Sequence, residues 1–401
     1  MLNFFPTLYP DELWYSAICR YHVWSGNPKP IESIRDLFQG RSYVDVGTVN
    51  PSNSIHDIIE QIPDGILDYK DIAIKHTLFN YAYRFQPIEA KNKMLYTIKA
   101  GTIHWPGAIS TPKKTYPRLK YCPICRIEDK NTYGEVFWHV SHQIPLATIC
   151  LKHRCRLITY VCSGLKDLDM KLLLPDVCTD DTVDYRIEPY EDFLNETVIT
   201  YFKMPMEITP SFGFNNLFEE LYNTGYGILR KDTGYQLNVK KLTNDLCIMF
   251  GDAFVREYFG KLERMECALK RLKFYWAKSP ERYAILATFL KQPIEITFSK
   301  NKIKNELFTG FLNFQKAYNG QPKKYIADRL GIPDRVMDSL ALYLGVEPFW
   351  KNEIPVKNST IVFRLTAAEK KRIQDFVKRE GYKNYSEFIM YCIKKELDVN
   401  I

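Results

Sequence analysis

The first part of the chain places apolar residues at helical spacing, with polar residues between them. This periodicity predicts helices around Glu12–Trp24, Ile31–Leu37 and Ile58–Ile62. Prolines and a glycine interrupt the pattern at Pro28, Pro30, Pro51, Pro63 and Gly65, and the basic stretch 111–117 is typical of a linker. The pattern therefore predicts a helical N-terminal domain over residues 1–117.

Helical periodicity returns beyond the loop-like acidic run Asp176–Asp184. It predicts a second helical domain over residues 166–310, with helices at Leu217–Asn223, Val239–Phe254 and Glu281–Leu290. Two compact patterns follow, at Pro322–Leu344 and Ser359–Leu397, and no internal repeat is present. The predicted fold class is therefore mainly α and multidomain.

Composition and charge narrow the class of protein. The 401 residues are 46% hydrophobic and 14% aromatic, which is enough for several cores and excludes wholesale disorder. The net charge of +8 suits a polyanionic partner without proving one. The first residues do not resemble a signal peptide, and no stretch of eighteen uncharged apolar residues occurs. We therefore expect a cytoplasmic protein, in which its ten cysteines serve as metal ligands more readily than as disulfides.

Four cysteine and histidine residues form two matched pairs within residues 118–165. Cys122-Pro-Ile-Cys125 is followed by Cys150-Leu-Lys-His153. Zinc prefers four soft or borderline ligands in a tetrahedron, and a two-residue spacer lets each pair bind from one tight turn. Three thiolates and one imidazole make a closed site that leaves no position for a reactive water. The spacing therefore predicts a zinc-binding module with a structural Zn²⁺ and no catalytic residue.

Other residues in this part of the chain leave alternatives open. His139 and His142 lie between the two pairs and could replace His153 as ligands, although the spacing of Cys150 and His153 favours the latter. A second metal site could include Cys155, Cys162 and Cys178, but their irregular spacing favours buried thiols.

Several motifs together resemble the TniQ/TnsD family. The metal-binding part carries the most specific ones: Tyr121-Cys-Pro-Ile-Cys125, Tyr133-Gly-Glu-Val-Phe-Trp-His139, His142-Gln-Ile-Pro145 and Cys150-Leu-Lys-His153. The N-terminal part carries Leu8-Tyr-Pro-Asp-Glu-Leu-Trp-Tyr-Ser16, followed by Arg20, and His76-Thr-Leu-Phe79. Farther along, the similarity includes Ser279-Pro-Glu-Arg-Tyr283 with Leu286 and Phe289-Leu290, so that it covers roughly residues 1–310.

The resemblance implies a function in the choice of a transposon's insertion site. Family members recognise DNA, or dock on an RNA-guided complex, and recruit an AAA+ ATPase regulator of the transposase. It implies a TniQ-like domain over residues 1–117, a TnsD-like domain over residues 166–310, and no enzymatic activity. By position, Cys122, Cys125, Cys150 and His153 become structural zinc ligands.

Residues 311–356 carry a pattern typical of a helix-turn-helix. Ala327 and Gly331 lie four residues apart, where two helices approach and the chain turns. Lys323 and Lys324 could contact phosphate, and Arg335 lies on the presumed recognition helix. An ordinary helical hairpin is the alternative, because Asp334 and Asp338 flank Arg335. The expected buried positions are Ile326, Leu330, Ile332, Met337 and Leu340.

Residues 357–401 resemble a ribbon-helix-helix fold. Apolar and polar residues alternate over 360–365, which predicts a strand, and capping boxes at Thr366–Glu369 and Asn384–Glu387 predict two helices. The buried faces would contain Ile361, Phe363, Leu365, Ile373, Phe376, Val377, Phe388, Ile389, Cys392 and Ile393. So small a unit cannot bury its apolar face alone, and we expect it to form a homodimer.

The paired strands of such a dimer would enter the major groove of DNA. Thr360, Val362 and Arg364 would face the bases, and Asn384 and Ser386 would hold a phosphate. From Lys357 onward the chain has ten basic and six acidic residues, a balance of +4. The alternative is a dimerisation module that never touches DNA.

The leading functional hypothesis is thus a DNA-binding target-site selector that acts with an AAA+ ATPase and a transposase complex, at the bacterial nucleoid. One alternative is an adaptor that docks on a CRISPR effector complex, in which the guide reads the sequence. A metal-dependent nuclease would use His139 and His142, but the sequence offers no convincing carboxylate cluster for it. A plain repressor would explain the last forty residues and leave the preceding region without a role.

Overall fold

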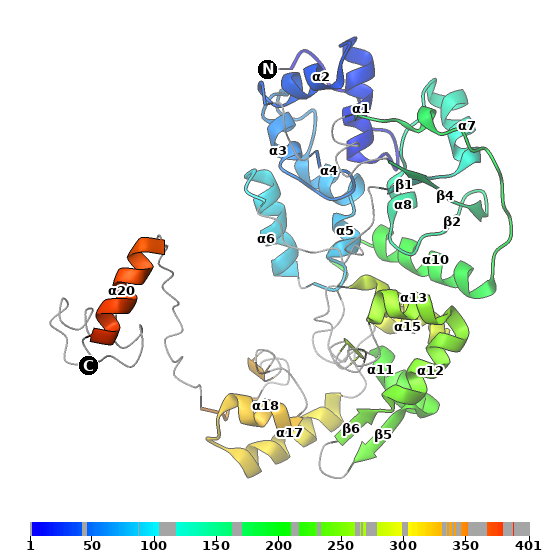
Figure 1. The fold of residues 1–401 in the computed structure, drawn as a ribbon. Coiled ribbons are helices and arrows are strands. Elements are labelled where there is room, and N and C mark those ends of the chain that lie inside the picture. Colours follow the sequence, from blue (N-terminus) through cyan, green and yellow to red (C-terminus); the bar gives the residue numbers. More distant parts are fainter. Residues whose placement is uncertain are drawn as a thin grey trace. The chain divides into compact units, whose positions relative to one another are not determined.

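The computed structural model describes most of the chain, in two compact units, Met1–Trp350 and Lys351–Ile401 (Figure 1). The described residues are 2–41, 46–86, 88–103, 118–162, 171–209, 216–230, 234–260, 265, 268–269, 279–298, 304–330, 334, 337–338, 341, 346–351, 367–379 and 388.

The N-terminal hundred residues are mainly helical, as the sequence predicts. The helices are α1 (Trp14–Ser25), α2 (Pro30–Leu37), α3 (Ser54–Ile59), α4 (Tyr69–Lys75), α5 (Phe79–Ala82) and α6 (Ile88–Lys99). The predicted start of the first helix at Glu12 is two residues early. Asp11 has a φ of 62° and Glu12 pairs with His139 in an isolated bridge, so both residues lie outside α1. The third helix was predicted too far along the chain, at Ile58–Ile62, because α3 spans Ser54–Ile59 and ends four residues before Pro63.

Residues 118–162, which we call the cysteine region, combine short strands and helices. Its elements are β1 (Arg118–Tyr121), α7 (Pro123–Tyr133), α8 (Val140–Gln143), β2 (Ile149–Cys150), β3 (Cys155–Arg156) and β4 (Ile158–Val161). Strand β1 pairs antiparallel with β4, so that Leu119 lies opposite Tyr160. Strand β2 pairs antiparallel with β3, so that Cys150 lies opposite Cys155.

The following part is again mainly helical. It contains η1 (Pro175–Val177), α10 (Pro189–Lys203), α11 (Asn216–Leu221), η2 (Tyr222–Tyr226), α12 (Val239–Phe250), α13 (Asp252–Phe259), α15 (Pro280–Leu290) and α16 (Ile294–Phe298). An antiparallel hairpin of β5 (Gly227–Arg230) and β6 (Gly234–Leu237) was not predicted. The single helix predicted over Val239–Phe254 is wrong. Gly251, with a φ of 86° and a ψ of 147°, separates α12 from α13.

One hydrophobic core joins the N-terminal helices, the cysteine region and the helices up to α15. Helix α10 packs on α15 and α5. The largest apolar side chains in this core include Trp14, Trp138, Tyr201 and Tyr283, all fully buried. The cysteine region is therefore anchored on both sides by helical structure.

A fully buried arginine, Arg84, closes the C-terminal end of α10. Its Nε donates to the carbonyl of Tyr201 at 2.7 Å, and its Nη2 donates to that of Met204 at 2.6 Å and to Asn80 Oδ1 at 2.7 Å. Its Nη1 donates to the carbonyls of Pro205 and Ile208, both at 2.9 Å. Carbonyls at a helix end have no partner within the helix, so Arg84 supplies the donors they lack.

A second, separate core lies around α17 (Lys304–Tyr318) and α18 (Lys323–Leu330). The predicted buried positions Ile326 and Met337 are buried and Leu330 is partly buried, and Ala327 is buried beside them. Phe311, Ala341, Phe349 and Trp350 complete this core. Gly331, Ile332 and Leu340 lie outside the described residues. The helix-turn-helix therefore stays a prediction.

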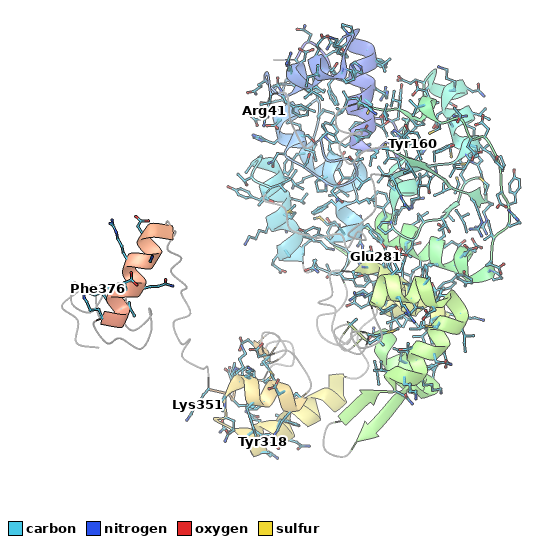
Figure 2. The ribbon with its side chains drawn as sticks, in the orientation of Figure 1. Arg41, Tyr160, Glu281, Tyr318, Lys351 and Phe376 are labelled. Atoms are coloured by element: carbon cyan, nitrogen blue, oxygen red, sulfur yellow. The ribbon has the colours of Figure 1, made fainter. Side chains whose placement is uncertain are left out.

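The C-terminal unit contains α20 (Ala367–Arg379), the helix predicted after the first capping box. Val377 is buried on it as predicted, but Phe376, labelled in Figure 2, is 38% exposed and not buried as predicted. The ring of Phe376 lies 5.3 Å from that of Phe388. The predicted strand over 360–365 lies outside the described residues, so the ribbon-helix-helix also stays a prediction. Among the described helices, none combines the length and apolar composition that a membrane span requires.

Candidate metal centre and its surroundings

The two cysteine and histidine pairs come together from two different elements, the start of α7 and the hairpin of β2 and β3. Cys122 is the N-cap of α7, where its Sγ accepts a hydrogen bond from the backbone N–H of Cys125, and Pro123 begins the helix. Cys150 ends β2, and His153 follows it in the turn that leads to β3. Arg154, with a φ of 54°, completes this turn. A helix start and a hairpin turn therefore bring four ligands together.

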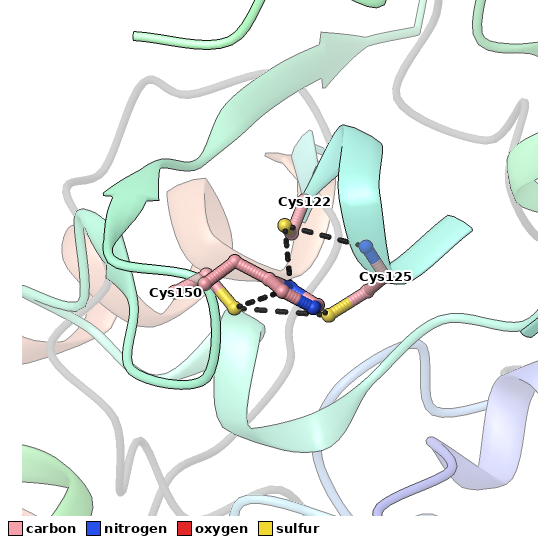
Figure 3. A group of neighbouring side chains, drawn as sticks. Cys122, Cys125 and Cys150 are labelled. Atoms are coloured by element: carbon pink, nitrogen blue, oxygen red, sulfur yellow. Dashed lines mark hydrogen bonds between the residues drawn. The ribbon is translucent and has the colours of Figure 1, made fainter. Parts of the chain in front are cut away.

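The ligand atoms lie at the spacing of a tetrahedral site (Figure 3). Nδ1 of His153 lies 3.4 Å from Sγ of Cys122, 3.3 Å from Sγ of Cys125 and 3.6 Å from Sγ of Cys150. The sulfurs of Cys125 and Cys150 lie 3.7 Å apart, and all four ligand atoms lie within 4.8 Å of one another. Zn–S and Zn–N bonds of about 2.3 and 2.0 Å place the ligands of a tetrahedron about 3.6–3.8 Å apart. The four residues fit such an ion.

Burial and a carboxylate support the same assignment. Cys122, Cys125 and Cys150 are at most 4% exposed. Nε2 of His153 lies 3.0 Å from a carboxylate oxygen of Glu128, while Nδ1 faces the sulfurs. A carboxylate behind a histidine ligand fixes the orientation of the ring and raises its basicity. The sequence did not single out Glu128, because one carboxylate on a helix surface is an unspecific signal.

The cluster favours a thiolate. Hydrogen bonds from Cys125 and Cys150 outweigh the effect of burial and lower the pKa of Cys122. Thiolate sulfur is the form that binds metal ions. A divalent cation would relieve the crowding of these sulfurs and stabilise the loops that carry them.

The alternative ligands occupy positions beside the cluster. Cys155 is buried and its Sγ lies 3.5 Å from that of Cys122, and Nε2 of His142 lies 3.9 Å from Sγ of Cys125. Cys162 and Cys178 are buried thiols. Within the described part of the chain, the group that could hold a metal ion is Cys122, Cys125, Cys150 and His153.

His139 is held in an ion network and not at the metal. Its Nε2 lies 2.9 Å from Asp129 Oδ2, and its Nδ1 lies 3.3 Å from Asp11 Oδ2. Burial lowers the pKa of His139, but hydrogen bonds and charges from these two carboxylates outweigh it and raise the pKa to about 9. With both nitrogens engaged, His139 is poorly suited to the metal-ligand role that a nuclease would require of it.

A second network explains part of the N-terminal motif. Arg20 is fully buried, with Nη1 2.9 Å from Glu12 Oε2 and Nη2 2.8 Å from Glu135 Oε1. Its guanidinium lies 3.8 Å from the ring centre of Tyr9, whose hydroxyl donates to Glu135 at 2.7 Å. Burial raises the pKa of Glu12 to about 7, although Arg20 opposes this. The network ties α1 to the cysteine region through Glu135, a pairing that the sequence did not indicate.

The predicted DNA contacts are mostly beyond what the structure describes. Thr360, Val362, Arg364, Asn384, Ser386 and Arg335 lie outside the described residues. Lys323 forms an ion pair with Asp338, which also accepts a hydrogen bond from Trp350 Nε1 at 3.2 Å. Lys324 is exposed. Asp338, whose side chain is 57% exposed, therefore bonds Lys323 and Trp350 at the surface of the second core, which gives this acidic residue a structural role.

Known proteins share the first 157 residues. The TniQ family model matches residues 3–157. The transposon Tn7 transposition protein TnsD of Escherichia coli is 27% identical over 154 residues, which cover 37% of this chain and 30% of that protein. The match thus spans about a third of the relative's length. The family-model match includes the N-terminal helices, the Arg20 network and all four candidate ligands, and the chain therefore carries a TniQ domain over residues 3–157.

Proposed function

We propose that this protein selects the insertion site of a TniQ/TnsD-type transposon. In this role it binds double-stranded DNA at the site and recruits an AAA+ ATPase that regulates the transposase. The observation that carries the proposal is the TniQ domain over residues 3–157, which it shares with a transposition protein. The relative is a transposition protein, and DNA binding and ATPase recruitment are our extension of that role.

The metal in this proposal is a structural Zn²⁺ held by Cys122, Cys125, Cys150 and His153. Three thiolates and one imidazole at tetrahedral spacing suit zinc better than magnesium or calcium, which prefer oxygen ligands. All four positions are filled by protein atoms, so the ion's role is to hold the cysteine region in shape.

DNA recognition is assigned to the C-terminal part of the chain. Residues 357–401 carry a balance of +4, half of the net charge of the whole chain. Thr360, Val362 and Arg364 would read bases, while Asn384, Ser386, Lys323, Lys324 and Arg335 would contact phosphate or flank the groove. A homodimer formed through residues 357–401 would read two half-sites. The protein would act in the bacterial cytoplasm, at the nucleoid.

Selection of bound duplexes from a random library tests this function directly. We expect the purified protein to enrich one sequence at moderate salt, and a variant lacking residues 358–401 to lose that enrichment while keeping its metal. Enrichment of no sequence would contradict direct recognition. Co-purification with a guide-RNA complex would instead support the adaptor hypothesis.

A further inference from the structure

An acidic segment lies along the cysteine region before the chain enters α10. Residues 176–192 contain seven acidic residues and one basic residue. In Figure 1 this segment passes the cysteine region on its way to α10, and η1 and the start of α10 are its regular elements. Tyr121 donates its hydroxyl to the carbonyl of Asp180 at 2.7 Å, and the backbone N–H of Arg156 donates to that of Asp184 at 2.8 Å. The segment is thus docked on the cysteine region.

Three arginines of the cysteine region meet this segment in order along its length. Arg126, on α7, forms an ion pair with Asp181 and donates to the carbonyl of Cys178. Arg156, on β3, forms a two-pronged pair with Glu191 at 2.9 and 2.7 Å. Arg154, in the turn beside the metal ligands, pairs with Asp192. Each of the three guanidinium groups is therefore neutralised by a carboxylate of the segment or of the first turn of α10.

These ion pairs remain accessible to solvent. At least one partner of each pair is exposed by a third or more: Arg154 is 47% exposed, Arg156 is 34% exposed beside Glu191 at 15%, and Asp181 is 60% exposed beside Arg126 at 16%. Accessible ion pairs contribute little to stability, so an exchange of one anionic partner for another costs little. A phosphate offers arginine the same forked geometry as a carboxylate. The arginines are thus positioned where a polyanion could replace the acidic segment.

We propose that Arg126, Arg154 and Arg156 form a surface for the phosphate backbone of duplex DNA, and that the acidic segment covers this surface in the free chain. The inference rests on the proposed function in DNA binding. It adds the location of a phosphate-binding surface and a segment that limits access to that surface. Contacts of this kind add affinity and orientation but no sequence preference. The acidic segment would therefore limit binding to random DNA until sequence-specific contacts elsewhere bring the duplex close.

Neutral replacements of the covering carboxylates test the inference. The triple variant Asp181→Asn, Glu191→Gln and Asp192→Asn keeps side-chain size and an oxygen at each position. We expect its affinity for a random duplex to rise at least tenfold at low salt. The slope of log affinity against log salt should steepen by about 0.9 for each arginine that gains a phosphate, or by about 2–3 in all.

A matched triple separates this effect from net charge. Asp64, Glu89 and Glu60 are exposed and lie outside the acidic segment, and no ion pair of theirs is found within the described part of the chain. Changing them to Asn, Gln and Gln alters the net charge equally and should leave the slope almost unchanged. An equal gain in both triples would overturn the inference.

Arginine replacements complete the test. Arg126→Gln, Arg154→Gln and Arg156→Gln together should change little in the otherwise native chain and should abolish the gain in the acid-neutralised chain. If the native protein binds DNA and the acid-neutralised triple binds no better, the inference fails and the proposed function stands. If neither protein binds any duplex at low salt, both fail. Metal content and thermal unfolding check that each variant folds. If the acid-neutralised triple does not fold, Asp181→Asn alone replaces it, and we then expect the slope to change by about 0.9 for one phosphate contact.

Discussion

The cysteine region and the helical region around α10 and α15 are stabilised in different ways. The sulfurs of Cys122, Cys125, Cys150 and Cys155 form a small cluster of their own, and among the described residues Ile124 and Leu157 pack against it. The rest of the cysteine region, including Trp138 and Val140, belongs to the large core. The helical region buries whole helix faces, including Val198 and Tyr201 of α10 and Ala284 to Ala287 of α15. So small a cluster cannot hold the two ligand-bearing turns by itself, and a metal ion provides there what packing does not. These turns thus depend on four ligand atoms, and the helical region depends on many apolar contacts.

The largest effect should follow from removing a ligand. We expect Cys125→Ser to lose the bound zinc and to unfold the cysteine region. Structural zinc in small peptides contributes about 10–16 kcal/mol, which is comparable to the stability of a whole domain. Elemental analysis and limited proteolysis would measure the loss, and the helical region should stay protected.

Two cysteine controls sharpen this prediction. Cys162→Ser and Cys155→Ser should each keep one zinc ion per chain, although Cys155 lies only 3.5 Å from Cys122. Loss of zinc in Cys155→Ser, with retention in a His153→Ala protein, would show that the ligand set is wrong.

The corresponding change in the helical region is Arg84→Leu. It removes donors from the carbonyls of Tyr201, Met204, Pro205 and Ile208 and from Asn80 Oδ1, and of these acceptors Tyr201 and Asn80 belong to buried residues. Each unsatisfied buried group costs about 1–3 kcal/mol, so we expect a loss of at least about 2 kcal/mol. Chemical denaturation would measure it. The zinc content should not change, and a loss of zinc would contradict the separation of the two regions.

The contact between the cysteine region and the N-terminal part, made by His139 and Asp11, should depend on pH. Because the pKa of His139 rises from 6.5 to about 9, its charge stabilises the fold fully below pH 6.5, and this stability is lost as the pH rises through 9. The difference corresponds to at most about 3 kcal/mol. We expect the gap in melting temperature between the native protein and His139→Gln to narrow from pH 6.5 to above pH 9. A gap that stays constant would contradict the ion network with Asp11 and Asp129.

The smallest effect is expected at Gly134, which ends α7 with a φ of 78°. Gly134→Ala places a Cβ in the left-handed region, at a cost of about 1 kcal/mol. No neighbouring atom lies within 4 Å of that Cβ, so the cost is conformational only. Thermal unfolding should show a small decrease with full zinc content. A decrease in melting temperature as large as that of Arg84→Leu would show that Gly134 does more than terminate α7.

Local patterns in the sequence predicted most helices well and long-range pairings poorly. Helical periodicity located α1, α2 and α15, and the two-residue spacers singled out Cys122, Cys125, Cys150 and His153, four side chains that lie together and could hold a metal ion. The break at Gly251 was missed because a glycine within a helical pattern is often tolerated. Glu128 behind His153 and Glu135 beside Arg20 carry no local signal, since each is one acidic residue among many.

By itself, the sequence determined which residues could bind a metal and which segments could be helices, because both depend on neighbours a few positions apart. The tertiary structure alone decided that His139 faces Asp11 and Asp129, that Arg84 closes α10, and that residues 176–192 cover three arginines. These partners lie between ten and well over one hundred residues apart in the chain. Charges and hydrogen bonds act over a few ångströms of space, and only the fold brings such residues within that distance.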